Sequence, residues 1–395
     1  MKQQLLGGLS SSDFLAKYWQ KQPLLIRGAW PGFKDPLSAD ELAGLAMEEG
    51  VRARLVQEKG GKRPWQLSHG PFQEKTLSTL PASHWTLLVS QVELWSEACA
   101  TLLDSFNFIP NWRGDDLMIS FAPPHGSVGP HVDSYDVFLL QGQGQRHWQI
   151  QTKPDLTWRP GLDLRLLQTF KAEDSWLLNP GDMLYLPPGV AHYGVATEAC
   201  MTYSVGFRAP AKQDLLAEMF NLPEALLALV QSEELYTDRD LRLQANPGEL
   251  SAAAVAQLKA MILAPLEHPT LLPRWLAAFV TKPSDVAAVA GGGRRPSAAR
   301  LAKLLAGHGA LWRNDAQRMV YLTPSADLLF FFVNGEEWSL HAALLPLVQQ
   351  LCLQRCHLGN ELAKALPRGK RRQEGMDLLT RLVASGACYF GKPLI

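Results

Sequence analysis

Three absences limit what this chain of 395 residues can be. It has no uninterrupted apolar run approaching about 18 residues, so we expect no transmembrane helix, and its start, Met1–Gly8, lacks the apolar core of a signal peptide. Its formal net charge is +0, so its overall field favours neither nucleic acid nor an anionic membrane. Its 5 cysteines are odd in number and scattered, which argues against a disulfide framework. These features predict a cytoplasmic protein with no membrane partner.

The hydrophobic pattern divides the chain into four segments, and 47% hydrophobic residues suffice for packed cores. Residues 1–90 are predicted to be a mixed α/β part of the first domain. Residues 91–210 are rich in short strands and turns, which is typical of a β-barrel or jelly roll. Residues 211–290 have helical periodicity, and residues 295–395 combine helices with a small hairpin, as in a winged-helix-like module. The predicted fold class is α+β.

Several local patterns predict single elements. A capping box is expected to begin at Ser38, and Trp85–Leu103 has apolar residues at steps of three and four, which predicts one amphipathic helix. The triple glycine Gly291–Gly293 is interpreted as a linker. Near the end of the chain, Asn334-Gly335 predicts a hairpin turn, and a helix is expected over Ala342–Cys356.

A basic cluster, Arg368–Arg372, lies between two predicted helices. It is expected to be a solvated loop, and contact with RNA phosphates is the alternative.

His131, Asp133 and His192 are the candidate metal ligands. In a strand the side chains at i and i+2 share a face, so His131 and Asp133 can reach one metal together. The second stretch, Asn179–His192, predicts a turn, a strand, a Pro-Pro-Gly turn and then the histidine. Two histidines and one carboxylate form a facial set that leaves three positions open on Fe(II). The alternative is that His131 caps a loop and that His192 is a core histidine.

A site of this kind often activates O2 with a 2-oxoacid, whose far carboxylate needs a buried cation. Arg146 is the candidate, because the turn at 141–144 would bring it back beside the metal ligands, and a guanidinium binds a carboxylate with two hydrogen bonds. An arginine on the barrel surface is the alternative interpretation.

The barrel segment resembles the JmjC-type 2-oxoglutarate oxygenases, and among them the bacterial ribosomal oxygenase (cupin-4) group. The resemblance runs over Asp115–Phe121, Val128–Phe138, Gly181–His192 and Tyr203–Pro210, and it extends to Phe14–Gly28 outside the barrel. It implies a double-stranded β-helix, a helical dimerisation region over 211–290 and a C-terminal winged helix. It also implies an Fe(II)- and 2-oxoglutarate-dependent dioxygenase that hydroxylates an arginine side chain of large-subunit ribosomal protein L-sixteen.

The resemblance also implies residue roles. It makes His131, Asp133 and His192 the iron ligands and Arg146 the 2-oxoglutarate clamp. Relatives often carry asparagine where this chain has Thr202, which could hold the cosubstrate only through one hydroxyl. The substrate arginine would meet a pocket of polar and apolar side chains: Asp116, Met118, Tyr135, Ser204 and Phe207. Asp116 can pair with a guanidinium and Tyr135 can stack on it; alternatively, Asp116 caps a turn, and Met118 and Phe207 are core residues.

Two other functions stay open. One is a related oxygenase that acts on another protein residue, such as a ribosomal histidine or a methylated lysine. The other is a metal-binding cupin adaptor without turnover. Metal cupins usually carry an HxH pair, so the H-x-D pair at His131 and Asp133 counts against the adaptor.

Overall fold

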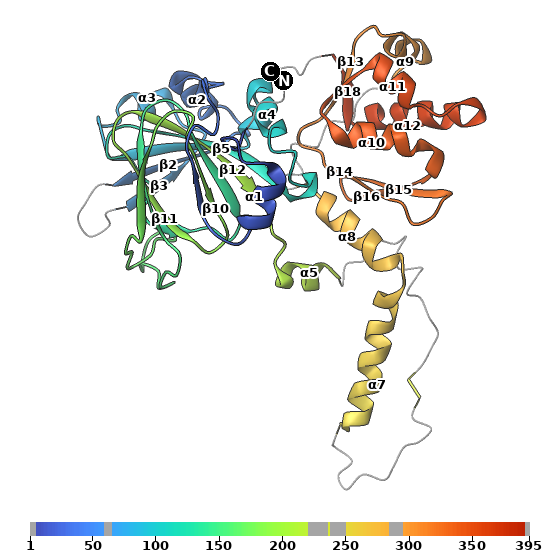
Figure 1. The fold of residues 1–395 in the computed structure, drawn as a ribbon, viewed down its shortest axis with the longest axis horizontal. Helices are drawn as coiled ribbons and strands as arrows, with labels where there is room; N and C mark the ends of the chain where they lie inside the picture. Colours follow the sequence, from blue (N-terminus) through green and yellow to red (C-terminus); the bar gives the residue numbers. More distant parts are fainter. Residues whose placement is uncertain (1–4, 59–64, 220–235, 238–249, 284–294, 392–395) are drawn as a thin grey trace. The chain divides into compact units, whose positions relative to one another are not determined.

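The computed structural model describes residues 5–58, 65–219, 236–237, 250–283 and 295–391. The chain forms two compact units, Met1–Ala209 and Pro210–Leu394 (Figure 1). Among the described helices, none has both the length and the apolar character that a membrane span requires.

The first unit is a β-barrel made of two sheets. The larger sheet has eight strands in the order β1-β10-β7-β12-β5-β4-β2-β3, and the smaller has four in the order β6-β11-β8-β9. Neighbouring strands pair antiparallel, and strands far apart in sequence lie side by side, as a jelly roll requires. The strands are β1 (Leu24–Ile26), β2 (Arg52–Glu58), β3 (Trp65–His69), β4 (Trp85–Ser90), β5 (Gly114–Ala122), β6 (His131–Val132), β7 (Asp136–Gln141), β8 (Arg146–Gln151), β9 (Asp174–Leu178), β10 (Met183–Leu186), β11 (Ala191–Ala196) and β12 (Cys200–Phe207).

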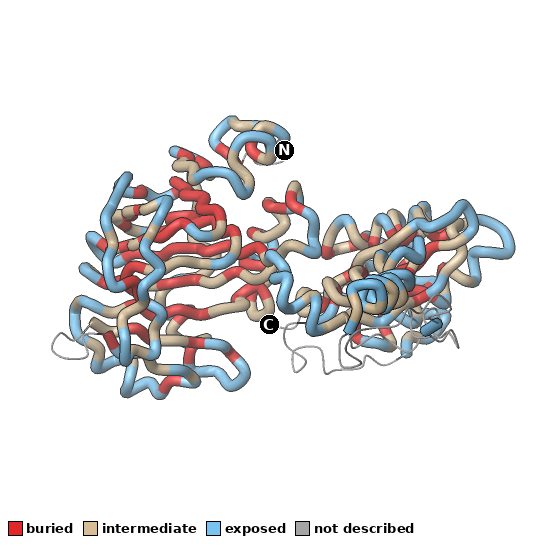
Figure 2. The backbone as a smooth tube through the Cα atoms, turned by 90° about the horizontal axis from the view of Figure 1, so that it is seen from below, coloured by how far each residue is buried: buried red, intermediate tan, exposed pale blue. Residues whose placement is uncertain are grey.

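Alternation along the strands of the larger sheet separates two cores. On β12, Tyr203 and Val205 belong to a core shared with the N-terminal helices, and every residue of this strand is buried. On β7, Phe138 belongs to the same outer core, whereas Val137 belongs to a second core inside the barrel. Figure 2 shows the buried residues concentrated in these strands. The inner faces of the strands therefore line the barrel interior, and the candidate site lies there.

Helices of the first unit cover the larger sheet. The capping box at Ser38 is confirmed, because its hydroxyl accepts from Glu41 N and the Glu41 side chain accepts from Ser38 N. The helix predicted over Trp85–Leu103 is wrong over its first half: Trp85–Ser90 is a strand paired with β2 and β5. A short apolar run that is buried on both faces gives the same pattern as a helix. The helices are α1 (Ser11–Lys17), α2 (Ala39–Leu45), α3 (Glu74–Ser78) and α4 (Glu97–Asp104), with short 3-10 turns η1 (Val92–Leu94) and η2 (Asn111–Arg113).

The second unit begins with helices and ends in a small α/β domain. The hairpin at Asn334-Gly335 is confirmed, since Val333 pairs with Glu336 across it. The helix predicted to reach Cys356 ends at Leu353, because Cys356 pairs with Trp312 in a sheet. The predicted linker at Gly291–Gly293 lies outside the described residues, as does much of the helical pattern predicted over 211–290. The elements are α5 (Lys212–Met219), α7 (Ala252–Leu263), η3 (Ala264–Glu267), α8 (Leu271–Thr281), α9 (Ala298–Leu305), β13 (Ala310–Arg313), β14 (Met319–Leu322), β15 (Leu328–Val333), β16 (Glu336–His341), η5 (Ala342–Leu344), α10 (Leu345–Leu353), β17 (Cys356–Leu358), α11 (Gly359–Ala365), η6 (Gly369–Arg371), α12 (Arg372–Ala384) and β18 (Cys388–Phe390).

Candidate active site

The structure brings His131, Asp133 and His192 together at one end of the smaller sheet. His131 on β6 lies directly opposite His192 on β11, and their ring centroids are 4.2 Å apart. Asp133 follows β6, and its Oδ2 lies 3.6 Å from His192 Nε2. One ligand atom of each residue lies within 4.8 Å of the others, as a single metal ion needs.

Backbone carbonyls orient both imidazoles. His131 Nδ1 lies 2.9 Å from Gly129 O, and His192 Nδ1 lies 3.2 Å from Val190 O. A carbonyl can only accept, so each Nδ1 carries the proton and each Nε2 keeps a lone pair for a metal. Burial, with His131 nearby, lowers the pKa of His192 to about 4, so this ring is neutral at neutral pH.

The turns before the ligands are fixed by close packing. Gly129 has a φ of 79°, and a Cβ there would meet Leu166 Cδ2 at 2.9 Å, so a side chain at this position is excluded. Gly189 of the predicted Pro-Pro-Gly turn donates its N–H to Asp133 O at 2.9 Å. This hydrogen bond ties the segment before His192 to the segment that carries Asp133.

Arg146 lies on the same inner face as the metal-ligand candidates. It begins β8, whose Ile150 pairs with His192 and whose Arg146 pairs with Ala196. Arg146 is only 3% exposed, which excludes the surface interpretation. Within the described chain, its Nε and one terminal nitrogen, Nη2, find no hydrogen-bond partner. Because a buried, unpartnered cation is costly, this arrangement fits a ligand that supplies a carboxylate.

Trp148 separates Arg146 from the histidines. Its ring centroid lies 5.9 Å from that of His192, and the guanidinium carbon of Arg146 lies 5.7 Å from the Trp148 ring. A Cβ on Gly194 would meet the indole at 2.7 Å, so glycine is needed on the neighbouring strand. The buried Thr202 is on an inner position of β12, where its hydroxyl lies 3.3 Å from Gln141 Oε1.

A second group of side chains gathers on the inner face where β5 meets β12. Met118 pairs with Ser204, and Asp116 lies two residues before Met118 on the same face. A Cβ placed on Gly206 would lie 3.4 Å from Asp116 Oδ1 and 3.7 Å from the Tyr135 ring. The carboxylate and the ring edge therefore flank the space that this glycine leaves open.

The charge environment of this group is unusual. Burial, with Asp115 adding to the effect, raises the pKa of Asp116 to about 6. Burial likewise raises the pKa of Tyr135, and Asp133 and Asp116 raise it further. An ionised carboxylate held in such a place favours a cationic partner, because pairing compensates for its lost hydration.

Phe207 does not join this group. Its ring packs on the outer side of the sheet against Trp19, Phe106 and Phe138, at centroid distances of 5.7, 6.2 and 5.7 Å. The core interpretation therefore describes Phe207, because strand alternation puts it on the same outward face of β12 as Tyr203 and Val205.

No sequence pattern points to Arg54, which lies beside the pocket. Its Nη2 is 3.3 Å from Met118 Sδ, and its charge acts on Asp116 and Tyr135. Arg54 is on β2, which is joined to the barrel only through β4, so no local motif could have predicted its place.

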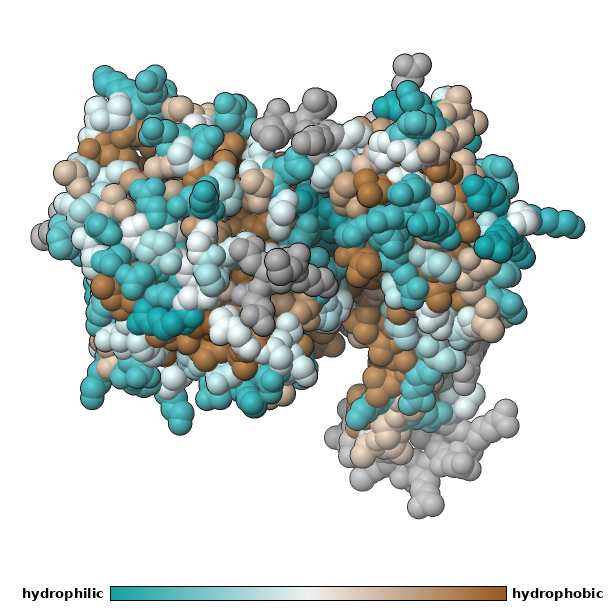
Figure 3. Space-filling model, turned by 45° about the horizontal axis from the view of Figure 1, so that its top comes forward, coloured by the Kyte–Doolittle hydropathy of each residue, from teal (hydrophilic) through white to brown (hydrophobic). Residues whose placement is uncertain are grey.

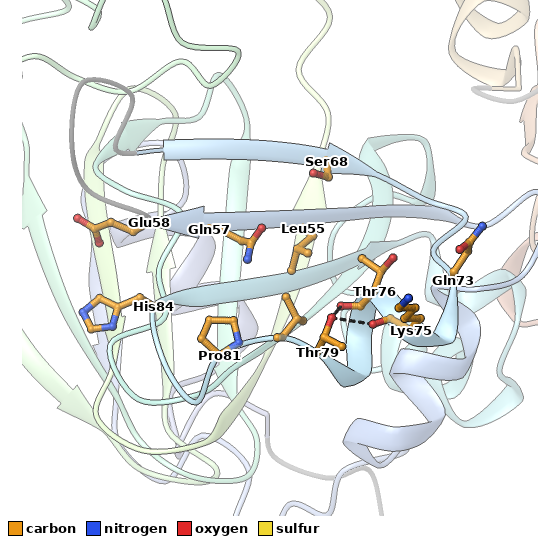
Figure 4. Close-up of a pocket in the computed structure, with 11 residues that line it drawn as sticks. Leu55, Gln57, Glu58, Ser68, Gln73, Lys75, Thr76, Thr79, Pro81 and His84 are labelled. Carbon is orange, nitrogen blue, oxygen red and sulfur yellow. Dashed lines mark hydrogen bonds between the residues drawn. The ribbon is translucent and has the colours of Figure 1, made fainter.

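A separate cavity of about 550 Å³ lies on the other side of β2 (Figure 4). It is lined by strand residues such as Leu55 and Gln57 and by Thr76 and Thr79 from α3 and the loop after it. None of the candidate site residues lines it.

Comparisons with known proteins agree with this geometry. The JmjC domain family matches residues 101–215, and the ROXA-like winged helix family matches residues 264–389. The "Ribosomal protein uL16 3-hydroxylase" of Escherichia coli (strain K12) is 41% identical over 275 residues, which cover 69% of this chain and 72% of the relative. The chain belongs to the JmjC-type ribosomal oxygenases. This membership confirms the predicted jelly roll, the winged helix and the class of iron- and 2-oxoglutarate-dependent dioxygenases.

A second relative and two solved structures support the same membership, and the structures cover nearly the whole chain. The "Probable ribosomal oxygenase" of Haemophilus influenzae is 36% identical over 65% of this chain and 64% of its own length. The crystal structure of Escherichia coli ycfD covers 99% of this chain and 100% of its own, with a TM-score of 0.85 and 34% identity. A complex of that ribosomal oxygenase with cobalt and 2-oxoglutarate superposes with a TM-score of 0.82, at 33% identity and over 98% and 99% of the two chains.

Proposed function

We propose that this protein is an Fe(II)- and 2-oxoglutarate-dependent hydroxylase of an arginine side chain of ribosomal protein uL16. The observation that carries the proposal is the inner face of the barrel. Two histidines and a carboxylate lie at one end of this face, beside a buried arginine with two donors that have no partner in the described chain, and a carboxylate and a tyrosine lie next to them. The relative in Escherichia coli is named for 3-hydroxylation of uL16, which supports the substrate.

The residues present fit the iron and the cosubstrate. His131, Asp133 and His192 would hold one face of the ion, and two neutral imidazoles with one carboxylate leave a single residual positive charge. Arg146 would bind the far carboxylate of 2-oxoglutarate with two parallel hydrogen bonds, through donors that have no partner in the described chain. When bound, the iron couples oxidation of a C–H bond by O2 to decarboxylation of 2-oxoglutarate, which yields the alcohol, succinate and CO2.

The protein's own contribution to the reaction is placement and exclusion of water. Trp148 fills the space between Arg146 and His192, so the cosubstrate would lie against an apolar wall. Asp116 would pair with the substrate guanidinium, and Tyr135 would lie against its planar face. These contacts would fix the alkyl chain of the substrate arginine near the iron, where a displacement of about 1 Å can cost about 100-fold in rate.

The test is a mass measurement on a peptide. Protein loaded with iron under anaerobic conditions is given 2-oxoglutarate, O2 and a peptide that spans the arginine loop of uL16. We expect the peptide to gain one oxygen atom with wild-type protein and to stay unchanged with His131→Ala. An Arg146→Ala variant should regain part of its activity at high 2-oxoglutarate concentration, because only cosubstrate affinity is impaired.

The same assay separates the other functions. Succinate release without a mass gain would keep the oxygenase and discard this substrate, and loss of a methyl group from a methylated lysine would point to a demethylase. Neither succinate nor a mass gain from folded, iron-bound protein would favour a metal-binding adaptor.

We also propose that the chain acts as a homodimer through its helical segment. Helix α7 has no buried residue, although its sequence is mostly apolar, and Val255, Leu258 and Ile262 are 47%, 40% and 70% exposed. Figure 3 shows hydrophobic surface along this helix. No described part of the chain covers this apolar face, and a face of this kind marks a site for protein contact.

Two further properties belong to the same proposal. A ribosomal substrate supports a cytoplasmic location. The exposed basic cluster at 368–372, which includes η6, is the surface that would contact ribosomal RNA, since phosphate contacts depend on exposed cations.

A further inference from the structure

Two ion pairs lie next to residues of the proposed substrate pocket. Arg208 Nε donates to Asp115 Oδ1 at 2.7 Å, and Arg113 Nη2 donates to Asp136 Oδ2 at 3.0 Å. Asp115 precedes Asp116 and Asp136 follows Tyr135 in the chain. Each ion pair therefore involves an aspartate that is the chain neighbour of a pocket residue.

The two ion pairs are placed differently relative to the pocket. The register between β12 and β5 shifts after Val205, so Asp115 and Asp116 lie together opposite Gly206, and a Cβ on Gly206 would lie 3.8 Å from Asp115 Cβ and 3.4 Å from Asp116 Oδ1. On β7, Phe138 belongs to the outer core, so Asp136 faces outward and Tyr135 faces inward.

The two arginines are joined to each other through the backbone. Arg208 N donates to Arg113 O at 2.6 Å, and Arg113 Nε donates to Arg208 O. Asp136 is fully buried and also accepts from Tyr185 Oη at 2.7 Å and from Gln20 Nε2 at 2.8 Å. The arrangement connects the start of β5, the start of β7 and the end of β12 beside the pocket.

We propose that Arg113 and Arg208 are positioning residues that fix the separation between Asp116 and Tyr135, and that this separation selects an arginine side chain. The inference rests on the proposed function, because it assigns a selective role to the walls of the same pocket. A guanidinium is planar and needs a carboxylate at its edge and a ring at its face at one fixed spacing, whereas an ammonium tolerates a range of spacings.

The same groups set the charge of the pocket. Asp116 is surrounded by Asp115 on its own strand, by Arg54 on β2 and by Arg208 after β12, and it accepts the backbone N–H of Gln91. Arg208 and Arg54 favour the ionised form of Asp116, and Asp115 opposes it. Removing the charge of Arg208 should therefore raise the pKa of Asp116, and removing the charge of Asp115 should lower it.

The test compares Arg208→Met, Arg208→Lys and Asp115→Asn in the peptide assay over a range of pH. Arg208 and Asp115 side chains are 32% and 35% exposed, so these variants should fold. Arg27→Met is the matched control, because Arg27 forms an ion pair with Asp182 at 2.6 Å that is not part of this arrangement.

For Arg208→Met we expect the KM of the peptide to rise about tenfold, with kcat and peptide-free turnover of 2-oxoglutarate little changed. The acid limb of kcat/KM should move to higher pH in Arg208→Met and to lower pH in Asp115→Asn, by about half a unit each. In Arg208→Lys the acid limb of kcat/KM should stay at its wild-type pH, because the positive charge is kept. The KM of the peptide should still rise, because the lysine lacks the planar guanidinium group.

A purely structural role would change kcat and KM together and leave the acid limb in place. That result, or a peptide KM in Arg208→Met equal to that of Arg27→Met, would overturn the inference. If the wild-type protein turned over 2-oxoglutarate but left the peptide unmodified, the proposed substrate would fail instead, and that result is visible before any variant is compared.

Discussion

His131 and His192 lie directly opposite each other in the antiparallel pair of β6 and β11, with their ring centroids 4.2 Å apart. Each ring is held by a carbonyl two residues earlier in the chain, just before the strand begins. Two strands that are sixty residues apart in sequence thus present two equivalent imidazoles, and the pairing register of β6 and β11 decides whether a metal can bind.

His192→Ala should abolish the stabilisation of the protein by metal. At a cobalt concentration about 100 times the Kd, wild-type protein gains about 2.7 kcal/mol, whereas the variant should gain nothing. The rise in Tm on adding cobalt measures this, and His84→Ala, an exposed histidine outside the site, serves as the control. An equal rise in Tm for His192→Ala and wild type would show that the metal binds elsewhere.

Arg146→Met should weaken 2-oxoglutarate binding without destabilising the free protein. Truncating one partner of a buried charge pair costs about 2–5 kcal/mol of affinity, yet in the free protein Arg146 has donors with no partner in the described chain. Calorimetry with 2-oxoglutarate and thermal unfolding in its absence measure the two effects. A large loss of Tm in the free variant would mean that Arg146 is a structural residue.

Asp116→Asn should abolish peptide binding and make the protein more stable at pH 7. Folding raises the pKa of Asp116 to about 6, so the folded state binds this proton more tightly than the unfolded state. The stabilisation linked to Asp116 is therefore complete below its unfolded pKa of about 3.9 and is lost as the pH rises through about 6.

Unfolding in urea at pH 5 and pH 7 would test this linkage. The stability gained by Asp116→Asn should be smaller at pH 5 than at pH 7, because the wild-type carboxyl is largely protonated at pH 5. An equal gain at both pH values would remove the electrostatic explanation.

Ile262→Glu should disrupt the proposed dimer while leaving the barrel intact. The side chain is 70% exposed on an apolar helix, so a charge is tolerated in a single chain but would be desolvated in an interface. Light scattering should give half the mass of the wild type, with unchanged turnover of 2-oxoglutarate. A monomeric wild type would contradict the dimer itself, and Lys259→Glu on the same helix controls for charge alone.

The sequence predicted the parts of the site that depend on short-range geometry. His131 and Asp133 follow from the two-residue period of a strand, and Arg146 follows from the turn that returns the chain beside them. Phe207 lies three residues after Ser204, so the two-residue period of a strand already puts these two side chains on opposite faces. Arg54, Arg113 and Arg208 carry no motif; their roles arise only when β2, β5, β7 and β12 are assembled into one sheet.

The helix prediction over Trp85–Leu103 was wrong in its first half because pairing with distant strands decides the structure there. Apolar residues at steps of three and four describe both an amphipathic helix and a strand buried on both faces. Its first six residues form a strand because β2 and β5 lie on either side of it, and this cannot be read from the segment alone.

Strand β1 pairs with β10, so Leu24 meets Tyr185 only after more than 160 further residues have been synthesised. The N-terminal segment therefore leaves the ribosome with no partner for its apolar edge, and sheet closure waits for β12. Pairings of such long range fold slowly and expose strand edges in the meantime. This protein should therefore depend on chaperones during its own translation, more than a chain whose neighbouring strands follow one another in sequence.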